Sequence, residues 1–116
     1  MRRWATGAVR ESDEGKPRYD LVPALAMRRV AHRFAEGALK YGEDNWKRGI
    51  PRRQILASAL RHVEAWRCCH EETGDAGLDV TRETGEDHLA AAVWGLLILM
   101  QYEETNTDVN DVQEST

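Results

Sequence analysis

The sequence predicts an all-α protein that forms a single helical bundle. Strong helix formers such as Ala, Leu, Arg and Glu are abundant, and β-branched residues are scarce. Over three stretches of the chain, apolar residues recur every three or four positions, which is the period of an amphipathic helix. A length of 116 residues fits one domain. We therefore expect residues 1–104 to form one all-α domain and residues 105–116 to be a disordered acidic tail.

The first helix is expected over residues 23–41, after a polar arm at residues 1–20. Pro23 suits the first turn of a helix, and Gly42 is well placed to end it. The apolar stripe between them consists of Met27, Val30, Ala31, Phe34, Ala38 and Tyr41.

Two further helices are expected over residues 51–69 and 85–103. Pro51 opens the second helix, and residues 84–87 match a capping-box-like start of the third. The acidic, glycine-broken stretch at residues 70–82 is interpreted as a functional loop. The stripe of the second helix is Ile55, Leu56, Ala59, Leu60, Val63 and Trp66, and that of the third is Leu89, Ala92, Val93, Leu96, Leu97 and Met100.

The third helix carries more apolar surface than one face can bury. The run from Leu96 to Leu99 is uninterrupted, and Trp94 lies just before it. A helix that is apolar over most of its circumference is buried on several sides. Because three helices alone make a thin core, we expect a homodimer or homotetramer that completes a four-helix-type bundle.

Charge and cysteine content restrict the partners and the compartment. The net charge of −4 gives no general attraction to nucleic acid, which usually needs a basic stripe, so no direct nucleic-acid binding is expected. Basic residues concentrate in residues 1–67 and acidic ones in residues 70–116, which suits an anionic ligand held against a metal cluster, or two docking subunits. The adjacent Cys68 and Cys69 favour a reducing cytoplasm. With no signal-peptide core and an apolar run too short to span a bilayer, we expect a cytoplasmic protein without membrane contact.

Carboxylates gather at the start of the third helix. Glu83 and Asp87 are one helical turn apart, so both can face one hard cation such as Mg²⁺ or Mn²⁺. The structural alternative, which is the commoner one for acidic helix starts, is a favourable interaction with the helix dipole. Under the metal hypothesis, an acid of the 70–82 loop, either Glu72 or Asp79, helps to complete the site, and His62 is a further candidate.

Two histidines belong to the same end of the bundle. His62 shares a helix face with Trp66, and His88 opens the third helix. The ordinary interpretation makes His62 a satisfied core residue and His88 a neighbour of the helix cap. The acidic residues around the two histidines suggest a second interpretation, in which His62 is catalytic and His88 is a metal ligand. An imidazole in the metal shell would favour Mn²⁺ over Mg²⁺.

A set of aromatic, amide and basic side chains suits a nucleotide. Trp46 can stack on a base while neighbouring lysines meet phosphates, although Trp46 can equally fill the core. Arg61 can hold a phosphate through its planar guanidinium group, or be a solvated helix charge. The predicted nucleotide-binding residues are Lys40, Asn45, Trp46, Lys47, Arg61 and Trp66.

Four strings of residues occur in register with a known family. They read GKPRYDLVP at 15–23, GALKYGEDNWKRG at 37–49, LRH at 60–62, and ETG followed by DHLA within 83–90. Together they resemble the phage and prophage family called dATP/dGTP diphosphohydrolase N-terminal, whose relatives include the phage enzyme MazZ. The resemblance covers roughly residues 10–102.

The resemblance implies the MazG-like all-α nucleoside triphosphate pyrophosphohydrolase fold, usually oligomeric. It also implies that a purine deoxynucleoside triphosphate, dGTP-like or dATP-like, is cleaved to monophosphate and pyrophosphate in control of the phage nucleotide pool. Carboxylates from two neighbouring helices then hold Mg²⁺ or Mn²⁺, which binds phosphate oxygens and activates a water. Glu83 and Asp87 match the acidic pair of the third helix.

The chain departs from the pattern of this family in two places. The second helix of MazG-type enzymes usually carries Glu-x-x-Glu, whereas residues 57–62 read ASALRH, and Gly95 stands where the family often has Asn. A pocket that lacks a metal would bind nucleotides without hydrolysing them. The second hypothesis is therefore a non-catalytic nucleotide-binding protein, such as a phage sponge that sequesters a signalling nucleotide.

Overall fold

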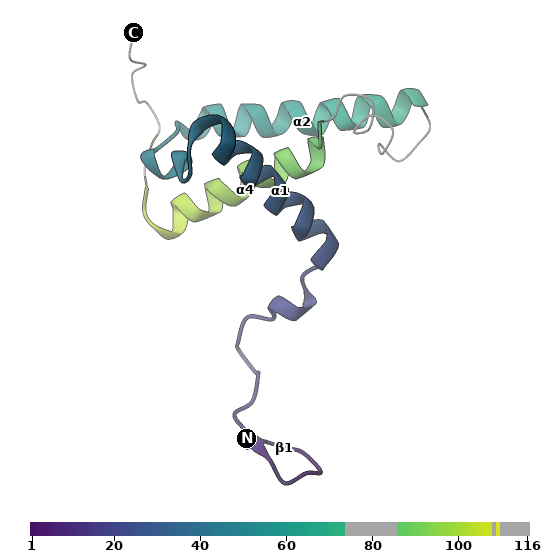
Figure 1. Ribbon diagram of the computed structural model, residues 1–116, viewed down its shortest axis with the longest axis vertical. Coiled ribbons are helices and arrows are strands. Elements are labelled where there is room, and N and C mark those ends of the chain that lie inside the picture. The colour runs from purple at the N-terminus through teal and green to yellow at the C-terminus, as the bar shows by residue number, and fades with distance from the viewer. Residues whose placement is uncertain (74–85, 108, 110–116) are drawn as a thin grey trace.

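The computed structural model describes residues 1–73, 86–107 and 109, without the side chains of residues 69–73. The ordered part is built from α1 (Ala24–Tyr41), α2 (Arg52–Thr73) and α4 (His88–Glu104) (Figure 1). The predicted all-α class is confirmed, and each of the three expected helices is present within a few residues of its predicted bounds.

The N-terminal arm projects away from the helices (Figure 1). Strand β1 (Arg2–Arg3) pairs antiparallel with β2 (Val9–Arg10), and a short 3-10 helix, η1 (Tyr19–Leu21), precedes α1. All residues from 1 to 29 are exposed. The described part of the arm therefore adds nothing to the core.

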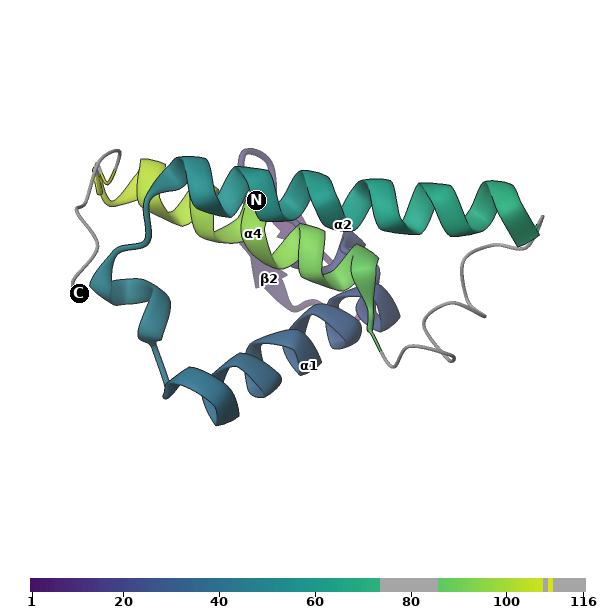
Figure 2. The same cartoon turned by 90° about the horizontal axis from the view of Figure 1, so that it is seen from above.

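Helix α1 ends where the sequence predicts. Gly42 has a φ of 92°, a conformation that glycine adopts readily, and its N–H donates to the carbonyl of Ala38 at 2.9 Å. The chain then turns through a second 3-10 helix, η2 (Asn45–Arg48), before Pro51 leads into α2. This connection holds α1 at a wide angle to the other two helices (Figure 2).

Helix α4 is the centre of the bundle, because it packs against both α1 and α2. Small residues on α4 allow α2 to come close. A Cβ atom at Gly95 would lie 3.3 Å from Cγ2 of Ile55 and 3.4 Å from Cβ of Ala59. Gly95, which departs from the family pattern, is thus a close-packing position in this chain, where a larger residue would push α2 away.

Tyr102 anchors the far end of α4. Its ring is buried with Ile55 and Ile98. Its hydroxyl group accepts a hydrogen bond from the N–H of Ile50 at 3.0 Å and donates one to the carbonyl of Trp46. Through these two bonds, Tyr102 fixes the segment that contains η2 to the core, against which Trp46 and Ile50 also pack.

The start of the predicted acidic tail contacts the bundle. The N–H of Thr107 donates to the carbonyl of Tyr102 at 2.8 Å, and the N–H of Arg52 donates to the carbonyl of Val109 at 2.7 Å. Residues 108 and 110–116, which make up most of the rest of that tail, lie outside the described residues.

The predicted buried face of the third helix is partly wrong. Val93, Leu96 and Met100 are exposed in the single chain, whereas the buried positions of α4 are Ala90, Ala91, Ala92, Gly95, Ile98 and Tyr102. The reason is that α4 is apolar on all sides, so periodicity does not choose a face. Among the described residues, no helix combines the length and apolar character needed to cross a membrane.

Candidate functional site

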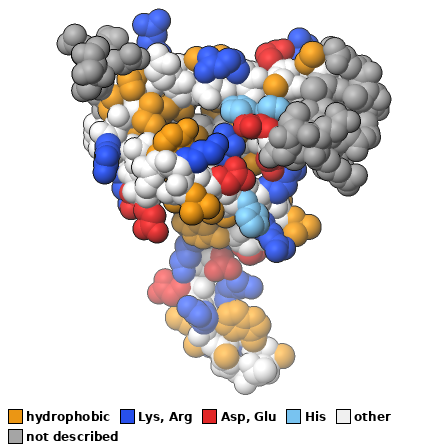
Figure 3. Space-filling view, turned by 45° about the horizontal axis from the view of Figure 1, so that its top comes forward, with side chains coloured by type: hydrophobic (Ala, Val, Ile, Leu, Met, Phe, Trp, Pro, Cys, Tyr) orange, Lys and Arg blue, Asp and Glu red, His pale blue; other side chains and the backbone are white. Residues whose placement is uncertain are grey.

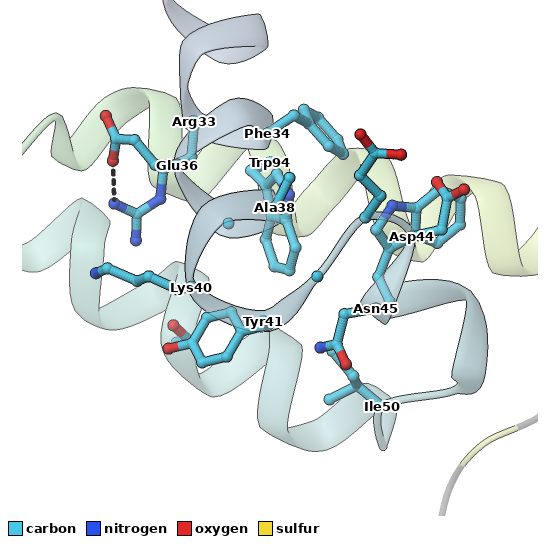
Figure 4. Close-up of a pocket in the computed structure, with 15 residues that line it drawn as sticks. Arg33, Phe34, Glu36, Ala38, Lys40, Tyr41, Asp44, Asn45, Ile50 and Trp94 are labelled. Carbon is cyan, nitrogen blue, oxygen red and sulfur yellow. Dashed lines mark hydrogen bonds and ion pairs between the residues drawn. The ribbon is translucent and has the colours of Figure 1, made fainter.

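A pocket of about 500 Å³ opens between the C-terminal half of α1 and the α2–α4 pair (Figure 4). This volume is in the range of sites for small organic ligands. The residues that give the pocket its chemistry are aromatic or polar: Arg33, Phe34, Glu36, Lys40, Tyr41, Glu43, Asp44, Asn45, Trp46 and Trp94.

Aromatic side chains from three elements form the walls of the pocket. Phe34 of α1 and Trp94 of α4 have ring centroids 5.9 Å apart and planes tilted by 52°. Trp46 of η2 packs on Tyr102, with centroids 6.4 Å apart. Because Phe34, Trp46 and Trp94 are only half-buried, they fill part of the core and also line the pocket. The two interpretations of Trp46 are thus compatible.

Cationic side chains lie along one side of the pocket. Lys40 and Arg33 come from α1, and NH1 of Arg33 is 3.4 Å from a carboxylate oxygen of Glu36 and 3.4 Å from one of Glu86 (Figure 4 shows the first contact). Lys47 lies outside the lining, with its Nζ 5.6 Å from the Trp46 ring centroid. Arg33 therefore connects the pocket to the start of α4.

Two histidines and a glutamate meet beside Arg33; we call them the histidine cluster. It consists of His62 on α2, with Glu86 and His88 at the start of α4. The Nδ1 atoms of His62 and His88 are 3.0 Å apart, and Nδ1 of His62 is 3.9 Å from Oε1 of Glu86. All three donor atoms lie within 4.8 Å of one another. Histidine and acidic side chains gather on this face of the molecule (Figure 3).

The environment of His62 favours its neutral form. Partial burial lowers the pKa of His62, and the positive charge of Arg33 lowers it further, while Glu86 acts in the opposite direction. A neutral imidazole has a lone pair available for a metal ion or a hydrogen bond. Histidines predicted from separate helices thus share one site in the structure.

Asp87 stabilises the start of α4. Its Oδ1 accepts a hydrogen bond from the N–H of Ala90 at 3.1 Å, which is a helix N-cap. Arg29 donates to both carboxylate oxygens, at 2.6 and 2.8 Å, and these bonds hold the pKa of Asp87 below its ordinary value. Asp87 is therefore ionised at neutral pH and paired, in agreement with the structural alternative for acidic helix starts.

The other predicted residues divide into three groups. Of the nucleotide-binding set, Lys40, Asn45 and Trp46 line the pocket together. Arg61 is exposed and Trp66 half-buried on α2, and within the described part of the chain neither lines that pocket. The remaining predicted ligands, namely Asp79, Glu83 and the side chain of Glu72, lie outside the described residues.

Several residues of the site were not predicted. Glu86 could have been found, because it lies between the strings ETG and DHLA, directly before Asp87. Arg33 and Phe34 carry no such signal, since the sequence contains many arginines and a core Phe is ordinary. Their place in the site depends on the angle at which α1 crosses α4, which periodicity does not specify.

The sequence also matches a known protein family. A family model described as dATP/dGTP diphosphohydrolase, N-terminal, matches residues 6–112, which include the pocket and the histidine cluster. The resemblance predicted from the four strings is confirmed. No curated protein and no solved structure matches the chain significantly.

Proposed function

Because the chain belongs to the dATP/dGTP diphosphohydrolase N-terminal family, we propose that it hydrolyses a purine deoxynucleoside triphosphate to the monophosphate and pyrophosphate. Membership by itself indicates a nucleotide hydrolase at a coarse level, through a domain that the family name calls N-terminal. The observation that carries the finer proposal is the aromatic pocket, whose cationic side leads through Arg33 to the histidine cluster.

The base of the nucleotide is proposed to bind among the aromatic walls of the pocket. Trp46 and Trp94 offer ring faces for stacking, and Asn45 offers an amide donor and acceptor for a base edge. A pocket of about 500 Å³ has room for a bicyclic base. Stacking alone would not separate one purine from another, so Asn45 is the residue proposed to contribute base selectivity.

The triphosphate is proposed to extend from the pocket towards the start of α4. Lys40 and Arg33 would meet its negative charge, and Arg33 already lies between the pocket and Glu86. Arg61 is exposed next to His62 and is proposed to reach the same phosphates from α2. Lys47, stacked over Trp46 and 3.3 Å from Asp44, is proposed to hold the loop beside the base.

The divalent cation of the reaction, Mg²⁺ or Mn²⁺, is proposed to be held by acidic residues. When bound, such an ion neutralises phosphate charge and lowers the pKa of a water that attacks in line. The proposed ligands are Glu72, Asp79, Glu83 and Asp87. Asp87 has the hard carboxylate oxygens required, but Arg29 donates to both of them, so a cation that binds Asp87 competes with this ion pair.

We further propose a MazG-like bundle that assembles as a homodimer or homotetramer in the cytoplasm and serves phage nucleotide-pool control. Exposed apolar side chains support the assembly, and they repeat at helical spacing: Leu56, Leu60 and Val63 on α2, and Val93, Leu96 and Met100 on α4. Sedimentation or light scattering at micromolar concentration is expected to give at least a dimer. A stable monomer would exclude the assembly.

The test of the activity is product release from a panel of nucleotides. The full chain is incubated with each of the four deoxynucleoside triphosphates and Mg²⁺ or Mn²⁺, and pyrophosphate, orthophosphate and nucleoside monophosphate are measured. We expect equal amounts of pyrophosphate and monophosphate from a purine substrate. Tight nucleotide binding without any release would instead identify a non-catalytic binding protein.

A further inference from the structure

The histidine cluster has a ligand set that differs from the acidic one proposed for the reaction. His62 comes from α2, and Glu86 and His88 come from the start of α4, so the three donors meet only in the folded chain. Two imidazole nitrogens and one carboxylate oxygen suit zinc and other first-row transition metals. Mg²⁺ prefers oxygen ligands and an octahedral shell that keeps several waters.

The spacing of these donors is close to that of a metal shell. Metal–ligand bonds of about 2.0–2.1 Å place neighbouring donor atoms roughly 3–3.5 Å apart. The two Nδ1 atoms, at 3.0 Å, already satisfy this spacing. Oε1 of Glu86 is 3.9 Å from Nδ1 of His62, and a glutamate side chain that is 37% exposed can rotate over the remaining distance.

We infer that His62, Glu86 and His88 form a binding site for one first-row transition-metal ion, Zn²⁺ being the best fit. Among the described residues the cluster supplies three protein donors, and a tetrahedral Zn²⁺ shell takes four ligands. Any catalytic use of this ion depends on the proposed function, whereas the binding itself does not.

Two interactions compete with a metal ion at this site. The histidines can share one proton as an Nδ1–Nδ1 hydrogen bond, which uses the lone pair that the metal needs. Arg33 also lies 3.4 Å from Oε1 of Glu86, where its charge satisfies the carboxylate in place of an ion. Removal of Arg33 should therefore strengthen metal binding, while removal of either histidine should weaken it.

The test is metal titration of the full chain, freed of metals by a chelator and without nucleotide. Co²⁺ is followed by its visible absorption bands, Zn²⁺ by calorimetry, and Mg²⁺ serves as the comparison ion. We expect one equivalent of Co²⁺, displaced by Zn²⁺, and no competition from Mg²⁺ at similar concentrations. Binding of Zn²⁺ should weaken at least about tenfold in His62→Gln and in His88→Gln.

The matched control is His32→Gln, because His32 is exposed on α1 and outside the cluster. It should leave Zn²⁺ affinity unchanged, and Arg33→Gln should raise it. If a histidine variant fails to fold by circular dichroism, Glu86→Gln replaces it, since that change keeps both imidazoles. The inference is overturned if Zn²⁺ affinity is the same in the wild type, in the folded cluster variants and in His32→Gln.

The outcome is separable from that of the proposed function. Pyrophosphate release without Zn²⁺ binding would remove this site and leave the hydrolase proposal in place. Zn²⁺ binding at the cluster without release of products from any nucleotide would remove the hydrolase proposal and leave the metal site in place.

Discussion

The two ends of α4 are held in different ways. At the C-terminal end, the ring of Tyr102 is 2% exposed and its hydroxyl group has two backbone partners. At the N-terminal end, the contacts are between half-exposed charged or titratable groups, such as Arg29 with Asp87 and Arg33 with Glu86. A buried group whose hydrogen bonds are all made does not readily give up its partners. Half-exposed ion pairs, in contrast, can replace a partner by an ion or a phosphate.

This difference suggests a division of roles along one helix. The C-terminal end fixes the loop that carries Trp46 and hence the shape of the pocket. The N-terminal end gathers the groups that would meet phosphates and cations. We therefore expect changes at the C-terminal end to act mainly on stability, and changes at the N-terminal end to act mainly on activity.

The largest expected effect is on hydrolysis, from Asp87→Asn. Asn is as good an N-cap as Asp, so the helix start is kept while the charge of the proposed ligand is lost. We expect pyrophosphate release to be abolished. The free energy of unfolding should fall by only about 1 kcal/mol or less, the usual scale for a partly exposed ion pair.

The matched control for this change is Arg29→Gln, which removes the same ion pair but keeps the carboxylate of Asp87. It should lower stability by a similar amount and retain hydrolysis. If Asp87→Asn releases pyrophosphate as fast as Arg29→Gln and the wild type do, Asp87 has only its capping and pairing roles.

The next largest effect is on stability, from Tyr102→Phe. This change keeps the buried ring and leaves the N–H of Ile50 and the carbonyl of Trp46 without their partner. We expect a loss of about 1–3 kcal/mol in the free energy of unfolding, measured by urea denaturation. Tyr41→Phe, at an exposed tyrosine that lines the pocket, should change this free energy by less than about 0.5 kcal/mol.

Lys40→Ala should weaken nucleotide binding by about 1.5–3 kcal/mol, the scale of a hydrogen bond to a charged group. The same loss of binding free energy is predicted for Arg61→Ala. Both variants are measured by calorimetry with a non-hydrolysable triphosphate analogue. Lys16→Ala, in the projecting arm, is the control. If Lys40→Ala or Arg61→Ala loses stability and keeps its nucleotide affinity, that residue is structural.

The smallest effect is expected at the rim of the pocket. Lys47→Ala removes an exposed cation that stacks on Trp46 and pairs with Asp44. Exposed contacts of this kind contribute about 0.5–1 kcal/mol, so affinity should fall at most severalfold. A loss as large as that of Lys40→Ala would mean that Lys47 contacts the phosphates directly.

The helices could be predicted from the sequence because their signals are local. Pro23, Pro51 and Gly42 lie at the ends of the observed helices, and the stripe of α1 correctly includes Val30 and Phe34. The orientation of α4 could not be predicted in this way. Apolar residues lie on all sides of α4. Its buried face is therefore decided by the packing of Ile55 and Ala59 of α2 against Gly95.

The candidate site could be predicted only in part, for a related reason. Lys40, Asn45 and Trp46 follow one another closely in the chain, and their common pocket reflects that proximity. Arg33 and Trp94 join them through the crossing of α1 with α4, which is a tertiary property. His62 and His88 were identified separately as interesting residues, but their 3.0 Å approach appears only in the folded chain.

The most direct test of the proposed hydrolysis is the position at which water enters the products. The full chain is incubated with dGTP and with dATP, each with Mn²⁺, in water enriched in ¹⁸O, and the products are followed by ³¹P NMR. We predict that the purine substrate gives monophosphate and pyrophosphate. All of the ¹⁸O should be found in one of these two products, because one water molecule attacks one phosphorus atom. Formation of a nucleoside diphosphate and orthophosphate, or no turnover of either nucleotide, would contradict the proposal.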